Sequence, residues 1–293
     1  MLLTGPTCSG KTQLALELAE RFDAEIVGAD SRQLYRGMPI GTAAPNKKQR
    51  ARVAHHLIGM LEPHERYSAA RFVRDALAAV RAIGARGKRT IVVGGTGFYV
   101  RALAGDVTLS ASYDEALRAR LAHEARVHPP DVLHAWLAAR APERAAALAA
   151  TDRYRVSRAL EIALAAPQAT RDDGAHGESL RSLAIANLKI ALDVAPELLE
   201  ERIETRVDAM LAAGLVAEAE RIGTVAVAAD AVGYPQALAF LAGWMSRREL
   251  RAALIRATRR YAKRQLTWLR SEPNVRWSKP EQVAAIATAT LGW

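Results

Sequence analysis

One stretch near the start of the chain has the residue types and spacing of a phosphate-binding loop (P-loop). It reads Gly5-Pro-Thr-Cys-Ser-Gly-Lys-Thr12 and lies between an apolar start and an amphipathic helix. Its terminal glycines let backbone N–H groups turn inward, and the positive end of the following helix adds to this cradle. The expected diphosphate-binding residues are Gly5, Pro6, Thr7, Cys8, Ser9, Gly10, Lys11 and Thr12. The alternative is a glycine-rich turn without a ligand.

Two residues of this loop have expected roles of their own. The ammonium of Lys11 would reach the terminal phosphate, and the hydroxyl of Thr12 would serve as a metal ligand. Mg²⁺ suits this position because it keeps most of its waters and takes its other ligands from phosphate and one or two protein oxygens. We therefore expect Mg²⁺ as the cofactor.

A carboxylate follows the second expected strand. Residues 24–29 form a short apolar run that predicts a buried parallel strand, and Asp30 comes directly after it. Ligands bind at the carboxyl edge of such sheets, so Asp30 should lie beside the P-loop. It could hold Mg²⁺ or take a proton, or it could simply cap the next helix.

A second glycine-rich turn, Gly94-Gly-Thr-Gly97, follows an expected strand at 90–93 and places Thr96 at the same edge. Alone it is weak evidence. The pair His55-His56 is expected to be a helix-end or packing pair, because no third metal ligand stands at a useful spacing.

The elements that must position these residues alternate between strands and helices. Further strands are expected at 188–193 and 274–277, and helices at 69–85 and 281–290. This order predicts an α/β fold, a P-loop NTPase-like parallel sheet flanked by helices, with an all-helical insertion. We expect residues 1–107 to form the first part of the core, 108–165 the insertion, with approximate boundaries, and 166–293 the second part with basic C-terminal helices.

Composition indicates the class of partner. The 293 residues carry a formal net charge of +10, which favours a phosphate-rich partner such as a nucleic acid, although an arginine-rich surface would give the same number. No membrane helix or signal peptide is visible, and the single cysteine excludes an internal disulfide framework. A cytoplasmic, monomeric protein is expected.

Arginines recur at helical spacing in three later segments. Arg155 and Arg158 are three residues apart and could contact phosphate or face solvent. Arg202 and Arg206 are four apart, so that one could reach a ligand while the other pairs with a glutamate. The segment 247–270 should be a helix that covers core with one face and presents cations on the other.

These motifs together resemble the tRNA dimethylallyltransferase family. The likeness is collinear over nearly the whole chain and rests on Gly5–Thr12, Asp30–Tyr35, Gly41–Pro45, His55–Leu57, Tyr67–Ala69, Gly94–Tyr99, Arg155–Glu161, Arg202–Arg206 and Lys263–Arg270. It implies transfer of a dimethylallyl group from dimethylallyl diphosphate to the exocyclic amine of the adenine just 3′ of the anticodon in tRNA. The tRNA-binding residues it implies are Asp30, Ser31, Arg32, Gln33, Tyr154, Arg155, Val156, Ser157, Arg158, Lys263 and Arg264.

The resemblance and the residue types together suggest three catalytic residues, Asp30, Thr96 and Arg206, which would act with Lys11 of the P-loop. Lys11 and Arg206 would stabilise the leaving diphosphate, and Thr96 could bind the same oxygens. Asp30 would be the general base for the adenine amine. Two departures from the family pattern, Ala44 and Pro235 in place of usual basic residues, predict changed affinity without lost activity.

Two other functions compete with this one. A P-loop kinase of a nucleoside or small acid would consume ATP, and a non-catalytic RNA-binding module would bind tRNA without modifying it. Cys8 also leaves two interpretations open. It could be a reactive thiolate that bound diphosphate shields, or a small apolar side chain beneath the loop.

Overall fold

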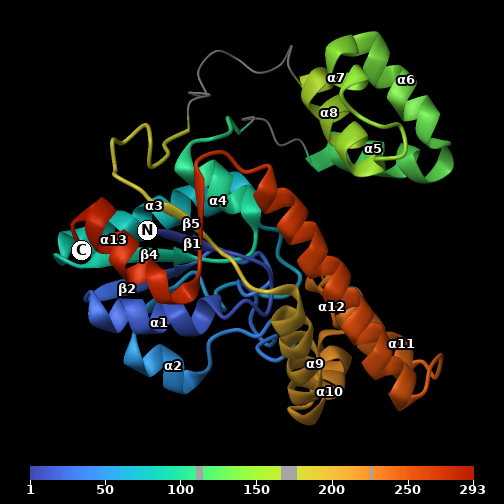
Figure 1. Ribbon diagram of the computed structural model, residues 1–293. Coiled ribbons are helices and arrows are strands. Elements are labelled where there is room, and N and C mark those ends of the chain that lie inside the picture. The colour runs from blue at the N-terminus through green and yellow to red at the C-terminus, as the bar shows by residue number, and fades with distance from the viewer. Residues whose placement is uncertain (110–114, 166–176, 225–226) are drawn as a thin grey trace. The chain divides into compact units, whose positions relative to one another are not determined.

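The computed structural model describes residues 1–293 except for 110–114, 166–176 and 225–226 (Figure 1). The chain divides into two compact units. One combines Met1–Val107 with Glu178–Trp293, and the other is Thr108–Gly177. The boundary that the sequence placed at residue 165 falls beside residues 166–176, which lie outside the described residues.

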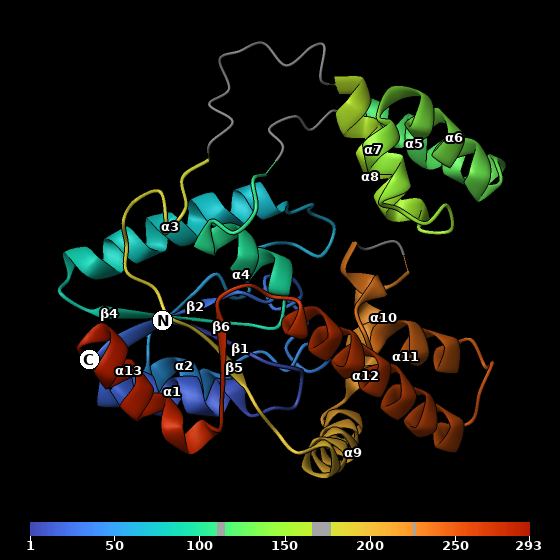
Figure 2. The ribbon, with the colours of Figure 1, turned by 45° about the horizontal axis from the view of Figure 1, so that its top comes forward.

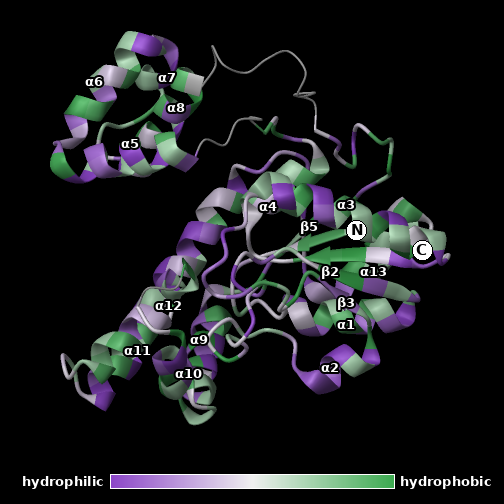
Figure 3. Cartoon of the chain, turned by 180° about the vertical axis from the view of Figure 1, so that it is seen from behind, coloured by the Kyte–Doolittle hydropathy of each residue, from purple (hydrophilic) through white to green (hydrophobic). Residues whose placement is uncertain are grey.

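A six-stranded sheet forms the centre of the first unit. Its strands are β1 (Leu2–Thr4), β2 (Ala24–Gly28), β3 (His55–His56), β4 (Arg89–Val93), β5 (Lys189–Leu192) and β6 (Val275–Ser278), in the order β3-β2-β4-β1-β5-β6. Every pairing is parallel. The predicted α/β class with a parallel sheet is therefore confirmed. The strands at its centre are mainly hydrophobic (Figure 3).

Strand β3 differs from what the sequence predicted. We expected His55-His56 at a helix end or in packing, but the two histidines form an edge strand in register with Ile26 and Val27. His56 Nε2 lies 2.7 Å from Glu25 Oε2, so the outer side chain is tied to a buried carboxylate of the neighbouring strand. A two-residue strand has no hydrophobic pattern of its own, which is why the sequence did not show it.

Helices cover both faces of the sheet (Figure 2). One face carries α1 (Lys11–Arg21) and α13 (Val283–Leu291), whose apolar side chains share a core with those of β1, β2 and β5. The other face carries α3 (Ala69–Ala85) and α4 (Gly97–Ala104). Ser68 caps α3 by accepting a hydrogen bond from the Arg71 N–H, as the sequence predicted. The short, polar α2 (Lys47–Arg52) has no buried residue.

A second core forms next to the P-loop. It joins α9 (Pro196–Ala212), α10 (Leu215–Ile222), α11 (Tyr234–Leu241) and the long basic helix α12 (Arg247–Arg270). Short 3₁₀ turns lie at Val227–Asp230 and Pro280–Gln282. Cys8 belongs to this core and packs with Ile203 and Leu254. The P-loop therefore rests on side chains from the C-terminal helices as well as on the sheet.

The described residues of the second unit form helices only. They are α5 (Glu115–Val127), α6 (Pro130–Arg140), α7 (Pro142–Ala146) and α8 (Arg153–Ala165). Their apolar faces meet in a small separate core that includes Leu121, Leu133 and Leu160. In the described parts of both units, no helix is long and apolar enough to cross a membrane.

Candidate active site

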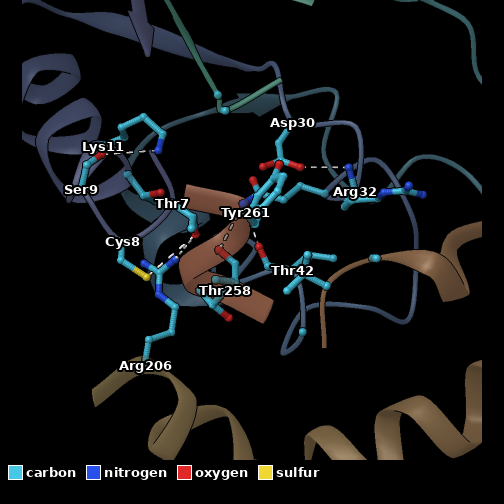
Figure 4. A pocket seen from close by; sticks show the side chains of 18 of the residues that line it. Thr7, Cys8, Ser9, Lys11, Asp30, Arg32, Thr42, Arg206, Thr258 and Tyr261 are labelled. Carbon is cyan, nitrogen blue, oxygen red and sulfur yellow. Dashed lines mark hydrogen bonds between the residues drawn. The ribbon is translucent and has the colours of Figure 1, made fainter. Parts of the chain in front are cut away.

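A cavity of about 440 Å³ opens at the carboxyl edge of the sheet. The P-loop, Asp30 and the Gly94–Gly95 turn line it from the ends of β1, β2 and β4, and α9 and α12 supply Arg206, Thr258, Tyr261, Arg264 and Gln265. Figure 4 shows Lys11, Arg206 and Asp30 arranged around the same space. The three groups that the sequence selected for diphosphate binding and proton transfer are thus brought together.

The P-loop has the backbone conformation of an anion cradle. Gly10 ends it in the left-handed region at φ 91° and leads directly into α1. Cys8 also has a positive φ of 65°, a conformation that costs free energy for a residue with a Cβ. Its buried side chain holds the residue in this conformation. The N–H groups at the start of α1 have no acceptor within the helix, so this end of the helix is suited to phosphate oxygens.

The side chain of Lys11 folds back over the loop. Its ammonium donates to the Pro6 carbonyl over 2.6 Å and to Ser9 Oγ over 3.4 Å. Burial, followed by the nearby charge of Arg206, lowers its pKa from 10.5 to about 8, against the opposing effect of Asp30. An anionic ligand bound beside Lys11 would favour its charged form.

Both arginines of α9 contact the P-loop. Arg206 Nη1 donates to Thr7 Oγ1 and Arg202 Nη1 to the Ser9 carbonyl, each over 3.2 Å. The expectation that one of them pairs with a glutamate is wrong, because the spacing of one helical turn directs both side chains to the same loop. Arg206 lines the cavity, so its guanidinium can exchange the Thr7 hydroxyl for a phosphate oxygen.

Asp30 lies in a tight turn that the neighbouring strand supports. Its Oδ1 accepts from the Arg32 N–H over 2.9 Å, a local bond typical of aspartate in turns. The next N–H, of Ser31, donates to Thr96 Oγ1 over 2.9 Å, and that hydroxyl donates in turn to Ser31 Oγ over 3.2 Å. Thr96 is therefore a positioning residue for the Asp30 turn in this structure. Its hydroxyl is engaged with Ser31, and the expected contact of Thr96 with diphosphate oxygens stays a prediction.

The loop after Asp30 is held by Gln33 and Arg32. Gln33 Nε2 donates to the carbonyls of Thr42 and Ala43 over 3.1 and 3.3 Å, and so fixes a wall of the cavity. Arg32 pairs with Asp230 over 2.7 Å. These contacts give the two residues structural roles in the free protein, and both still line the cavity.

Two side chains of α12 were not selected from the sequence. Tyr261 is half-buried close to Asp30, and burial followed by the charge of Asp30 raises its pKa. Gln265 is 8% exposed and reaches the P-loop. It occupies the buried stripe of α12 between Ala262 and Leu269, and a polar residue at such a position is the signal that could have found it.

The donor set for a metal consists of oxygens. Thr12 and Asp30 both line the cavity, and the described residues contain no group of three or more His, Cys, Asp or Glu that could hold an ion by themselves. Such a sparse set suits Mg²⁺, which is bound largely through waters and substrate phosphates.

The predicted tRNA contacts of the helical unit have different environments. Tyr154 is 80% exposed, Ser157 is partly buried, and Arg155 lies 3.4 Å from Asp152. Val156, by contrast, is fully buried in the core of this unit, so the prediction that it contacts tRNA is wrong for its side chain.

Arg158 is also engaged within the helical unit. It pairs with Glu161, a buried carboxylate that Arg118 contacts as well, over 3.1 Å. Arg158 therefore carries a structural ion pair on α8 that a phosphate would have to compete with.

The cations of α12 fall into two groups. Arg251 and Arg259 form ion pairs with Asp208 (2.6 Å) and Glu204 (2.9 Å) of α9. The exposed residues Arg256, Arg260, Lys263, Arg264 and Arg270 have no carboxylate within 4.0 Å among the residues that the structure describes. Exposed cations without a carboxylate partner are suited to RNA phosphates, and Arg264 among them also lines the cavity.

Two family models and several known proteins are similar to this chain. The IPP transferase family model matches residues 33–272, and an isopentenyl transferase model matches residues 1–58. A tRNA dimethylallyltransferase 2 from Geotalea uraniireducens is 42% identical over 99% of this chain and 96% of its own length. A tRNA dimethylallyltransferase from Xanthomonas oryzae is 46% identical over 96% and 89%.

Solved structures extend the similarity to the fold. The full-length tRNA isopentenylpyrophosphate transferase from Bacillus halodurans superposes with a TM-score of 0.71 at 33% identity, covering 99% of this chain and 96% of that one. A tRNA delta(2)-isopentenylpyrophosphate transferase from Staphylococcus epidermidis gives 0.68 at 30% identity, with coverage of 99% and 97%.

Proposed function

The chain belongs to the tRNA dimethylallyltransferase family, and we propose that its cavity is where that family's reaction takes place. A dimethylallyl group passes from its diphosphate to the exocyclic amine of the adenine on the 3′ side of the tRNA anticodon. The observation that carries the proposal is that Lys11, Arg206 and Asp30 line the same cavity.

Lys11, Arg206 and the amides at the start of α1 bind the leaving group. When the allylic carbon separates from its oxygen, negative charge grows on the diphosphate, and fixed donors placed around it lower the barrier. Arg206 already donates to Thr7 in this loop, and Lys11 donates to Pro6. Both cations therefore contact the loop that is proposed to bind the diphosphate.

Asp30 takes the proton of the attacking amine. Its Oδ1 is held by the Arg32 N–H, and we assign Oδ2 to the amine. The Ser31–Thr96 bonds keep the carboxylate at the cavity, which favours one orientation before substrate arrives. An adenine stacked in an RNA loop cannot reach this group, so the base must flip out into the cavity.

Mg²⁺ is the proposed cofactor, with Thr12 as its protein ligand. When bound, it would neutralise part of the charge on the diphosphate. The oxygen donors at the cavity and the ion's preference for phosphate and water support this assignment. The proposal also includes action in the cytoplasm, on tRNA, by a monomer.

The direct test is incubation with dimethylallyl diphosphate, Mg²⁺ and unmodified tRNA, followed by digestion of the RNA and mass measurement of its nucleosides. We expect one adenosine to gain a five-carbon unit. Consumption of ATP without any such gain would instead identify a kinase. Tight tRNA binding with no mass change would identify an RNA-binding module.

A further inference from the structure

Gln265 of α12 connects the two glycine-rich turns of the site. Its Oε1 accepts a hydrogen bond from the Thr7 N–H over 2.7 Å, and its Nε2 donates to the Gly95 carbonyl over 2.9 Å. These turns follow β1 and β4, which pair directly. A primary amide offers an acceptor and a donor at adjacent atoms, so it satisfies both turns with one side chain.

The contact to Thr7 extends to the leaving-group arginine. The main chain of Thr7 is bound by Gln265, and its hydroxyl accepts the bond from Arg206 over 3.2 Å. The next residue, Cys8, has a φ of 65°, so the backbone here adopts a conformation that needs support from its surroundings. Gln265 provides that support from outside the loop.

Gln265 packs closely against the second glycine-rich turn. A Cβ placed on Gly95 would lie 2.3 Å from Gln265 Nε2, and one on Gly97 would lie 2.1 Å from the Trp268 ring. The last turns of α12 therefore lie directly against the second glycine-rich turn. Lys263 and Arg264, immediately before Gln265, are exposed, so the helical turn that presents cations to RNA also holds the diphosphate loop.

We propose that Gln265 is a positioning residue for the transfer reaction. It fixes the main chain of Thr7, and through the Thr7 hydroxyl it sets Arg206 against the leaving diphosphate. This role rests on the proposed function, since it requires that Arg206 acts on that group. The side chain of Gln265 need not touch the diphosphate.

The test compares Gln265→Leu with the wild-type protein in steady-state transfer, varying dimethylallyl diphosphate at saturating tRNA. We expect kcat to fall roughly 10- to 100-fold, because a shift of about 1 Å in a catalytic group can cost about 100-fold. The dissociation constant for tRNA should stay within about twofold, since Lys263 and Arg264 are unchanged. Arg251→Gln, which breaks an ion pair on the same helix, is the control and should keep wild-type kcat.

A double-mutant cycle identifies the route. Thr7→Val removes the hydroxyl that accepts from Arg206, and the two losses should combine to much less than their product, because both disturb the same contact. Simple multiplication of the effects would overturn the route through Thr7. An unchanged kcat in Gln265→Leu, or a loss confined to tRNA affinity, would overturn the proposal itself.

Two controls separate the possible failures. If Gln265→Leu does not fold, judged by circular dichroism, Gln265→Met replaces it, because its unbranched side chain keeps the length but lacks both the acceptor for Thr7 and the donor to Gly95. The same kcat loss is expected, and wild-type kcat in that variant would overturn the proposal. Failure of the proposed function has a different signature, since the wild-type protein itself would then add no five-carbon unit.

Discussion

The carboxylate of Glu218 accepts a hydrogen bond from the hydroxyl of Tyr234 over 2.7 Å, and neither side chain is exposed to solvent. The same carboxylate accepts from the N–H groups of Ile40 and Gly41 over 3.0 and 2.8 Å. Gly41 lines the cavity, and a Cβ there would lie 2.5 Å from the Tyr234 ring. A buried carboxylate and its tyrosine therefore hold one wall of the site.

Replacing Glu218 should destabilise the protein strongly. Glu218→Leu leaves the N–H groups of Ile40 and Gly41 without their acceptor, while the Tyr234 hydroxyl keeps only a longer bond to the Met38 carbonyl, 3.4 Å. At about 1–3 kcal/mol for each lost bond we expect the free energy of unfolding to fall by roughly 2 kcal/mol or more. Tyr234→Phe removes one of these bonds and should cost about 1–2 kcal/mol. Urea denaturation measures both. Tyr154→Phe, at an exposed position, is the control, and an equal midpoint in all three variants would refute the role of Glu218.

Asp30→Asn should lower turnover by roughly 100-fold or more, because general-base catalysis contributes about 10²–10⁴. Its amide keeps an acceptor for the Arg32 N–H, so the turn and the tRNA affinity should be preserved. Single-turnover transfer and a filter-binding assay measure the two quantities. The control is Asp208→Asn, which changes the ion-pair partner of Arg251 and should keep wild-type turnover. Near-normal turnover in Asp30→Asn would remove the assignment of Asp30 as the base.

The fold was predictable where the determining interactions are local. The P-loop, the strand before Asp30 and the strand at 90–93 each carry their own signal in a few consecutive residues, and the structure has all three. The edge strand His55–His56 exists only because β2 pairs with it, so no pattern within it could predict it.

The site was predictable for residues that belong to a motif and not for those that distant packing brings in. Lys11, Asp30 and Arg206 were selected for their chemistry, and all three line the cavity. Gln265 contacts Thr7 across 258 positions of sequence, a pairing that only the docking of α12 creates. The contact of Thr96 with Ser31 is likewise made across the sheet edge and carries no signal in the sequence around either residue.

Lys263→Gln should weaken tRNA binding and lower the salt dependence of that binding. Each neutralised phosphate contact contributes slightly less than one unit to the slope of log K against log salt concentration, so the slope should fall by about one unit or less. Arg251→Gln is the matched control on the same helix, because Asp208 already neutralises Arg251. Equal slopes for the two variants would mean that the RNA path does not cross this part of α12.

Cys8 should react slowly with thiol reagents. The side chain is 4% exposed and packs in the core between the P-loop and the C-terminal helices, which supports the apolar interpretation over the reactive one. Labelling at neutral pH should be slow with and without dimethylallyl diphosphate and Mg²⁺, and fast in urea. If the native protein is labelled rapidly with parallel loss of activity, and the diphosphate suppresses this labelling, Cys8 is a reactive thiolate.

The affinity for dimethylallyl diphosphate should depend on pH through Lys11. Burial and the charge of Arg206 lower the pKa of this ammonium to about 8 in the free protein. A bound diphosphate favours the charged form, so the pKa rises in the complex. Below pH 8 the group is protonated in both states and contributes no pH dependence. Above pH 8 binding must take up a proton, and the affinity should fall by up to about tenfold per pH unit until the pKa of the complex is reached.

Calorimetry at pH 9 in two buffers of different ionisation enthalpy measures that proton directly. Wild-type protein should take up close to one proton more than Lys11→Met, whose side chain cannot titrate, and comparing the two cancels the ionisation of the ligand. Lys11→Met should also bind more weakly at pH 7, where the wild-type ammonium is charged and faces the phosphate site. Equal proton uptake by the two proteins would show that Lys11 is already charged at pH 9 before the ligand binds. The lowered pKa would then be refuted.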